Sequence, residues 1–371
     1  MKKFIIVGAG ILGASTAYRL VKAGAEVVIV DRNDSGQATD AAAGIICPWL
    51  SQRRNKAWYQ LAKGGARYYP DLINELKSDG ETNTGYTQSG AISLHHESKK
   101  LDAMEERAFK RRESAPEMGE ISRLSADQAK DLFPPLSGEM GAVHVSGAAR
   151  VDGRLLLNAL LRASEKHGAK RINGSASLLV KNQKAYGVSV EKEVITGDKV
   201  IVTAGAWARK LLEPLGISFQ VSFQKAQILH LELPDVETGN WPVVMPPKSH
   251  YLLAFERNRV VAGTTHEDTA RYDTRVTAGG IQEILEKTLQ TAPGLSDSTL
   301  LETRVGFRPF TPGFLPVIGT VPGFEGLLTA NGLGASGLTM GPYIGSQLAK
   351  LALEEATEID LSLYDVSGAL A

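Results

Sequence analysis

Hydrophobic and polar positions follow two different periods in the first part of the chain. Residues 4–7 (FIIV) and 26–30 (EVVIV) form short, mostly apolar runs, which are typical of buried strands in a parallel sheet. Apolar residues between positions 12 and 21 instead recur with helical spacing. The pattern therefore predicts a strand, a helix and a second strand, in that order.

The rest of the chain shows both periods in a less regular order. Helical spacing predicts helices over residues 55–77, 99–114, 124–134, 152–168, 206–216 and 280–290, and a last helix that follows a glycine-rich loop near residue 337. Asp152 and Gly168 are the expected N-cap and C-cap of the helix between them. Strands are expected over residues 89–96, 141–145, 199–203, 222–233, 250–256, 259–265, 300–310 and 326–330.

This order of elements predicts an α/β fold of the α+β two-domain type. Separated segments, residues 1–80, 141–215 and 300–371, are expected to build a Rossmann-type dinucleotide-binding domain. Residues 81–140 and 216–299 are expected to form a substrate-binding domain around an antiparallel β-sheet. Because no flexible linker separates the two, we expect a long shared interface with the ligand bound at it.

The turn after the first strand carries the pattern G-x-G-x-x-G at Gly8, Gly10 and Gly13, and the second strand ends at Asp31. In a dinucleotide site these glycines allow a tight turn, close approach of a pyrophosphate and close helix packing, and the acid binds a ribose hydroxyl. An export signal is the alternative interpretation, but it does not require a second strand that ends in an acid. Asp31 disfavours a 2′-phosphate and therefore NADP. The motif leaves NAD and FAD open.

Composition narrows the classes of partner and site. The chain has 371 residues with 41 basic and 41 acidic side chains, which gives no reason to expect a nucleic-acid partner. Cys47 is the only cysteine, so an intrachain disulfide or a cysteine-ligated metal site is not expected, and no metal is predicted. No apolar run approaches the roughly 20 residues of a membrane span. We expect a cytoplasmic protein and leave peripheral membrane association and homo-oligomer formation open.

Five stretches together resemble the FAD-dependent D-amino-acid oxidase family, in particular its glycine oxidase, sarcosine oxidase and D-amino-acid dehydrogenase branches. They are VGAGILG (7–13), DAAAGII (40–46), VTAGAWA (202–208), HYLLAFERNRVVAGTT (250–265) and the pair GFRPFTPGFLPVIG (306–319) and NGLGASGLTMG (331–341). The resemblance covers nearly the whole chain and implies FAD as the cofactor. Branches with covalent flavin use a cysteine near the last stretch, whereas Cys47 lies early in the chain, so noncovalent FAD is expected.

By this resemblance, small and apolar positions would contact FAD. The last stretch opens a helix whose N-terminal amides would face the flavin pyrimidine edge and stabilise negative charge there. A flexible loop, an ordinary turn and a glycine-rich helix cap are the alternatives for the individual segments. The residues implied are Gly8, Gly10, Ile11, Leu12, Gly13, Asp31, Arg32, Ala38, Thr39, Ala43, Gly44, Ile45, Ser177, Gly205, Gly334, Ala335, Ser336, Gly337, Leu338 and Thr339.

The resemblance also implies three substrate-binding residues. Arg308 would clamp the substrate carboxylate, Tyr251 would donate a second hydrogen bond to it, and His266 would face the substrate side chain. Without the resemblance, a surface or ion-paired arginine and a core tyrosine are the more common explanations, and a solvent-facing histidine explains His266 equally well. No residue is assigned as an acid or base catalyst, because the flavin performs the redox chemistry.

The implied reaction is oxidation of the amine of a small amino or imino acid, such as glycine, sarcosine, a D-amino acid or a proline-like compound. Hydride would pass from the α-carbon to flavin N5, and the imine would hydrolyse to a keto acid. Electrons would then pass to O2 or to a membrane or protein acceptor. Glycine oxidase-like relatives carry an arginine where this chain has Ala335, so the substrate class stays open. The alternatives are an FAD-binding subunit or assembly factor of a larger dehydrogenase and, from another class, an NAD-dependent dehydrogenase.

Overall fold

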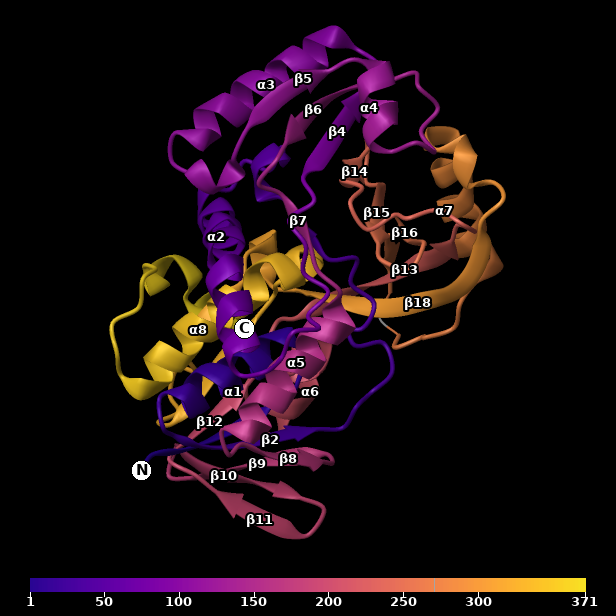
Figure 1. Cartoon of the computed structure of the whole chain (residues 1–371). Helices are drawn as coiled ribbons and strands as arrows, with labels where there is room; N and C mark the ends of the chain where they lie inside the picture. The colour runs from indigo at the N-terminus through magenta and orange to yellow at the C-terminus, as the bar shows by residue number, and fades with distance from the viewer. Residues whose placement is uncertain (270) are drawn as a thin grey trace.

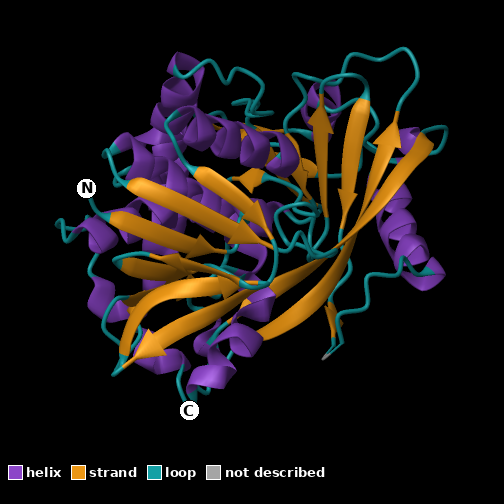
Figure 2. Ribbon diagram, turned by 90° about the horizontal axis from the view of Figure 1, so that it is seen from below, coloured by secondary structure: helices purple, strands orange, loops and turns teal. Residues whose placement is uncertain are grey.

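Two large sheets dominate the computed structural model, which describes residues 1–269 and 271–371 (Figures 1 and 2). The first has six strands in the order β19-β20-β12-β1-β2-β8, and its four central strands run parallel. It combines segments from both ends and the middle of the chain: β1 (Lys3–Val7), β2 (Glu26–Asp31), β8 (Lys170–Asn173), β12 (Lys199–Val202), β19 (Val317–Thr320) and β20 (Leu327–Asn331).

Helices α1 (Ile11–Lys22), α2 (Lys56–Ser78), α5 (Gly153–Lys166) and α8 (Gly337–Leu353) pack beside this sheet (Figure 1). The first and last of them are in direct contact, although they come from opposite ends of the chain. A Cβ atom on Gly345 would lie 2.7 Å from Cβ of Ser15, so the glycine permits this close approach. The apolar residues of these helices form a hydrophobic core with one face of the sheet.

The second sheet has nine strands and is mainly antiparallel. Its longest strands, β13 and β18, pair along most of their length. The strands are β4 (Ala91–His95), β5 (Ile121–Leu124), β6 (Gly141–Val145), β13 (Ser222–Glu232), β14 (Val243–Met245), β15 (Tyr251–Phe255), β16 (Arg259–Gly263), β17 (Glu267–Asp268) and β18 (Thr299–Phe310). The helices α3 (Ser98–Arg112), α4 (Ala126–Leu132) and α7 (Ala278–Thr291) pack against it.

Smaller elements complete the fold. A three-stranded sheet contains β9 (Ala176–Lys181), β10 (Lys184–Val190) and β11 (Glu193–Thr196), and β3 (Ile45–Ile46) pairs with β7 (Ala149–Arg150). The short helix α6 (Ala208–Leu212) follows β12. It is shorter than predicted, because Pro214 has no N–H to continue the helix and the chain forms a 3-10 turn there.

The mixed α/β fold predicted from the sequence is confirmed, and the predicted helices and strands have counterparts at the expected places. Asp152 caps α5 as predicted, by accepting hydrogen bonds from the amides of Arg154 and Leu155. The division into domains remains a proposal. Strand pairing moves its boundaries, because β6 and β18 belong to the nine-stranded sheet and not to the six-stranded one.

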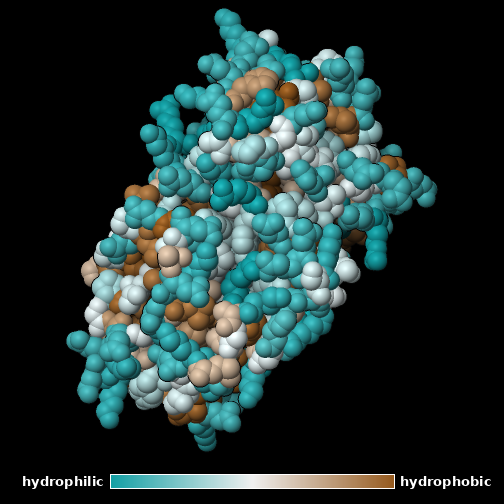
Figure 3. All heavy atoms as spheres, turned by 60° about the vertical axis from the view of Figure 1, so that its left-hand side comes forward, coloured by the Kyte–Doolittle hydropathy of each residue, from teal (hydrophilic) through white to brown (hydrophobic). Residues whose placement is uncertain are grey.

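The molecular surface mixes hydrophilic side chains with scattered hydrophobic patches on the face drawn in Figure 3. In the part of the chain that the structure describes, no helix is both long and apolar enough to cross a membrane.

Candidate functional site

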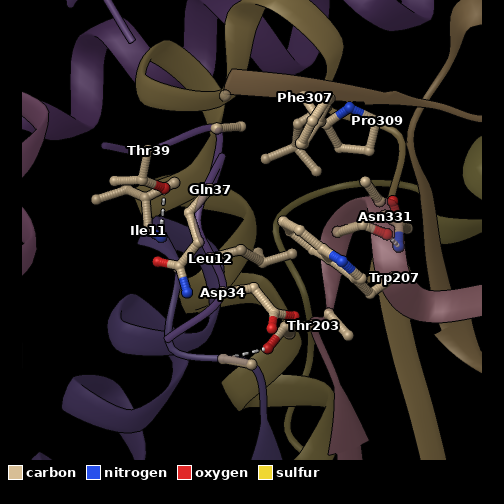
Figure 4. Close-up of a pocket in the computed structure, with 18 of the residues that line it drawn as sticks. Ile11, Leu12, Asp34, Gln37, Thr39, Thr203, Trp207, Phe307, Pro309 and Asn331 are labelled. Carbon is tan, nitrogen blue, oxygen red and sulfur yellow. Dashed lines mark hydrogen bonds between the residues drawn. The ribbon is translucent and has the colours of Figure 1, made fainter. Parts of the chain in front are cut away.

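A cavity of about 450 Å³ lies where the six-stranded sheet meets β13, β15 and β18. Its wall comes from the ends of β1 and β12, the loop over residues 37–45, strand β18 and the loop over residues 331–339 (Figure 4). Most of the lining is small or apolar, with a few polar groups. This volume and composition are typical of a cofactor or ligand site.

The glycine-rich turn lies at one end of this cavity, and close backbone contacts require glycine at two of its positions, Gly8 and Gly13. Gly8 has a φ of +108°, and a Cβ atom there would lie 2.5 Å from the carbonyl oxygen of Thr203. A Cβ atom on Gly13 would lie 1.9 Å from the carbonyl oxygen of Gly8. Gly8 and Gly10 line the cavity, whereas Gly13 does not. Gly13 therefore acts through packing of α1 against the turn.

Asp31 is held at the end of β2 beside this turn. Its carboxylate accepts hydrogen bonds from the amide of Ala9 at 2.6 Å, the amide of Asn33 at 2.6 Å and the side chain of Gln37 at 3.0 Å. Asp31 and Arg32 both line the cavity. The fixed carboxylate therefore presents its remaining acceptor positions to a ligand with hydroxyl groups.

The segment from Ala38 to Ile45 forms one wall. Thr39 accepts a hydrogen bond from the amide of Ile11 at 3.0 Å, which ties this segment to the start of α1 (Figure 4). Gly44 has a φ of +95°, and a Cβ atom there would lie 1.8 Å from the carbonyl oxygen of Val151. Gly44 therefore lets this wall pack closely against Val151, and the alanines at positions 41–43 present only small side chains to the cavity.

Two helix N-termini open onto the same cavity. Helices α1 and α8 each begin without an acidic residue in the first turn and without a side-chain cap. Apart from the Ile11 amide, which donates to Thr39, the first N–H groups of these helices lack a carbonyl acceptor within the helix, and with the partial positive charge there they favour an anionic or electron-rich ligand. Among the sequence-predicted residues of the last loop, five line the cavity and Ser336 does not: Gly334, Ala335, Gly337, Leu338 and Thr339.

Arg308 lines the cavity from β18, and its neighbours there are neutral. Its guanidinium donates to the hydroxyl of Thr264 at 3.0 Å and to the side-chain oxygen of Gln224 at 3.4 Å. In the described residues Arg308 forms no ion pair with an aspartate or glutamate. A half-buried guanidinium with only neutral acceptors is prepared to bind an anion.

Tyr251 lines the cavity beside Arg308, at the start of β15. A Cβ atom on Gly263 would lie 2.5 Å from the hydroxyl oxygen of Tyr251, so this glycine makes room for the phenol ring. Burial raises the pKa of the Tyr251 hydroxyl, although the nearby Arg308 charge opposes this shift. The phenol therefore keeps its proton at neutral pH and can donate a hydrogen bond.

The other sequence-predicted residues divide between the cavity and its surroundings. Ser177 and Gly205 line the cavity, as do Ile11, Leu12, Ala43 and Ile45. His266 is exposed and does not line it. Partial desolvation of the imidazole lowers the pKa of His266 although much of the residue is exposed, and the charge of Arg308 lowers it further, so the two side chains are close enough to interact electrostatically. The role of His266 toward a substrate stays a prediction.

Sequence reasoning missed several side chains of the cavity wall. Trp207 and Phe307 form part of an aromatic cluster with Tyr272 and Phe223, in which Trp207 and Tyr272 stack at 5.4 Å between ring centroids. Asn331 donates to the carbonyl oxygen of Gly205 at 2.9 Å and so joins two of the predicted loops. Trp207 and Phe307 both lie inside the recognised motifs, which is the sequence signal that could have identified them.

Cys47 is buried and does not line the cavity, although Ile45 does. Burial raises the pKa of its thiol to about 12, so the reactive thiolate form is strongly disfavoured at neutral pH. For metals, residues 1–269 and 271–371 contain no group of three or more His, Cys, Asp or Glu side chains arranged to hold an ion.

Comparisons with known proteins agree on one family. The family model described as "DAO: FAD dependent oxidoreductase" matches residues 3–351. The uncharacterized oxidoreductase YurR of Bacillus subtilis is 64% identical over 100% of both chains, and a glycine oxidase of Pseudomonas aeruginosa is 29% identical over 100% of both. The crystal structure of iminodiacetate oxidase from Chelativorans sp. BNC1 matches with a TM-score of 0.95 and 48% identity over 98% of each chain.

Proposed function

Because this chain belongs to the DAO family of FAD-dependent oxidoreductases, we propose that it oxidises the amine of a small amino or imino acid. The cofactor is noncovalently bound FAD, for which the glycine turn, the fixed Asp31 carboxylate and the two helix N-termini provide a matching site. The names of two relatives specify glycine and iminodiacetate, and both compounds contain an N–CH2–COO⁻ group. We therefore propose that the substrate of the present chain contains the same group.

One observation carries the proposal: the guanidinium of Arg308 faces the cavity with neutral partners only. A carboxylate can accept two parallel hydrogen bonds from such a group, which fixes its orientation as well as its position. The Tyr251 hydroxyl, which retains its proton, supplies a further donor on the same side. Together they would hold an amino acid by its carboxylate.

In this mechanism the protein mainly positions the substrate beside the cofactor and supplies little acid–base chemistry. FAD supplies the acceptor for the hydride of the substrate α-carbon. Arg308 and Tyr251 orient that carbon by fixing the carboxylate, and the apolar walls exclude water. The first turn of α8 directs free N–H groups at the site, where they stabilise developing negative charge. The amine gives its proton to solvent before the apolar walls enclose the substrate, so a catalytic base is not needed within the site.

The test is an anaerobic titration of the purified protein, followed by its flavin absorbance. Glycine, sarcosine, iminodiacetate, D-alanine and proline are added in turn, and bleaching by at least one of them supports the proposal. Admission of air then distinguishes transfer of electrons to O2 from transfer to another acceptor. A stable flavin spectrum with all five compounds would instead favour an FAD-binding subunit without amino-acid turnover.

A further inference from the structure

The helix that faces the flavin site has a proline near its start. In α8, Pro342 lies five residues after the first helical residue, Gly337. Each helical N–H normally donates to the carbonyl four residues earlier, and proline has no N–H. The carbonyl oxygen of Leu338, in the first turn, therefore lacks the helical hydrogen bond that residue 342 would otherwise supply.

A tyrosine from another helix supplies the missing donor. The hydroxyl of Tyr69, in α2, donates to the carbonyl oxygen of Leu338 at 2.6 Å. Tyr69 is fully buried, and its ring stacks on that of Tyr86 at 5.4 Å between centroids. Burial also raises the pKa of the Tyr69 hydroxyl, so it remains a donor across the accessible pH range.

The two helices are in close contact at this point because of a glycine. A Cβ atom on Gly65 would lie 2.0 Å from the carbonyl oxygen of Thr339, so only glycine lets α2 approach the first turn of α8 this closely. Thr339 in turn donates through its hydroxyl to the carbonyl oxygen of Ile45 at 2.9 Å, in the neighbouring segment of the cavity wall. The first turn is therefore held from both sides.

We propose that Tyr69 is a positioning residue for FAD. Its hydroxyl replaces the backbone hydrogen bond that Pro342 removes, and it thereby holds the first turn of α8, with its free N–H groups, against the flavin. Leu338 and Thr339 line the cavity on this turn. The proposal rests on FAD binding in this cavity and does not depend on which substrate the enzyme oxidises.

The test compares FAD dissociation constants of purified holoproteins, measured from the fluorescence of flavin released on dilution. Tyr69→Phe removes one buried hydrogen bond and is expected to raise the dissociation constant about three- to tenfold. Tyr68→Phe is the matched control, since the hydroxyl of Tyr68 is bonded to Arg19 and not to α8's first turn. We expect its dissociation constant to stay within about twofold of wild type.

The variant Pro342→Ala provides a second, independent test. It restores an N–H that can donate to Leu338, so the Tyr69 hydroxyl becomes redundant and Tyr69→Phe in this background should change FAD affinity by less than about twofold. An unchanged dissociation constant in Tyr69→Phe, or the same loss in both backgrounds, would overturn the proposal. If Tyr69→Phe alone does not fold, rescue of holoprotein by Pro342→Ala supports the proposal, and failure of the double variant overturns it.

Discussion

Replacement of Arg308 by lysine tests the carboxylate site directly. The variant keeps the positive charge but loses the planar pair of donors that matches a carboxylate. In the wild type, the two terminal nitrogens of the guanidinium donate to Gln224 and Thr264, so its orientation is fixed before a ligand binds. Lysine would present a point charge without this preorganisation.

The expected loss of carboxylate affinity follows from the two hydrogen bonds that the guanidinium of Arg308 would donate to the carboxylate. A hydrogen bond to a charged group contributes about 1.5–3 kcal/mol, and lysine can replace one of the two. Because 1.4 kcal/mol corresponds to a factor of ten, the dissociation constant of a carboxylate should rise about 10- to 100-fold. FAD affinity should stay unchanged, since Arg308 acts on the substrate side of the cavity.

The assay titrates the oxidised protein with acetate, a carboxylate that cannot be oxidised, and follows the perturbation of the flavin spectrum. Arg304→Lys is the control, because this arginine lies on the same strand but is ion-paired with Glu302 and does not line the cavity. Its acetate affinity should match wild type. Equal acetate affinities in wild type and Arg308→Lys would refute the assignment of this residue.

Three further results are expected. Thr264→Val removes the hydroxyl that accepts from Arg308 and should weaken acetate binding about three- to tenfold, with recovery in Thr264→Ser. Gly13→Ala places a methyl group 1.9 Å from the carbonyl oxygen of Gly8, so purified protein should contain little flavin and melt at a lower temperature. Burial lowers the pKa of the His250 imidazole from 6.5 to about 4 in the folded protein. Between these two pH values the imidazole is therefore protonated more fully in the unfolded chain than in the folded one. The unfolding free energy of the wild type should therefore fall by up to about 3 kcal/mol as pH falls from 6.5 to about 4. Denaturant unfolding of His250→Gln checks this, because its unfolding free energy should fall less over the same pH interval.

Local features of the fold were predictable because their causes lie close together in sequence. The change of period around α1 identified the strand–helix–strand unit, and Gly8 and Gly13 meet in a turn only a few residues long. Asp152 could be assigned as an N-cap because its partners are the next two amides after Gly153. Such contacts need no knowledge of the tertiary structure.

Features of the site that depend on pairing of distant strands were not predictable. Gln224 reaches Arg308 only because β13 and β18 pair in one particular register, and a shift by one residue would turn these side chains to opposite faces. The wall formed by Trp207 and Phe307 likewise joins segments about a hundred residues apart. For His266 the sequence left a solvent-facing position and a substrate-facing one open, and only the tertiary structure shows that the side chain is exposed.

The contact between α1 and α8 also determines when the cofactor site is completed during synthesis. Residues 11–22 leave the ribosome first, whereas their packing partner comprises residues 337–353. At typical elongation rates of about 5–20 residues per second, α8 is synthesised roughly 15–60 s after α1 and the glycine-rich turn. Over that interval the part of α1 that contacts α8 lacks its native partner, although β2 and α5 are already synthesised, so completion of the cofactor site belongs to the end of translation.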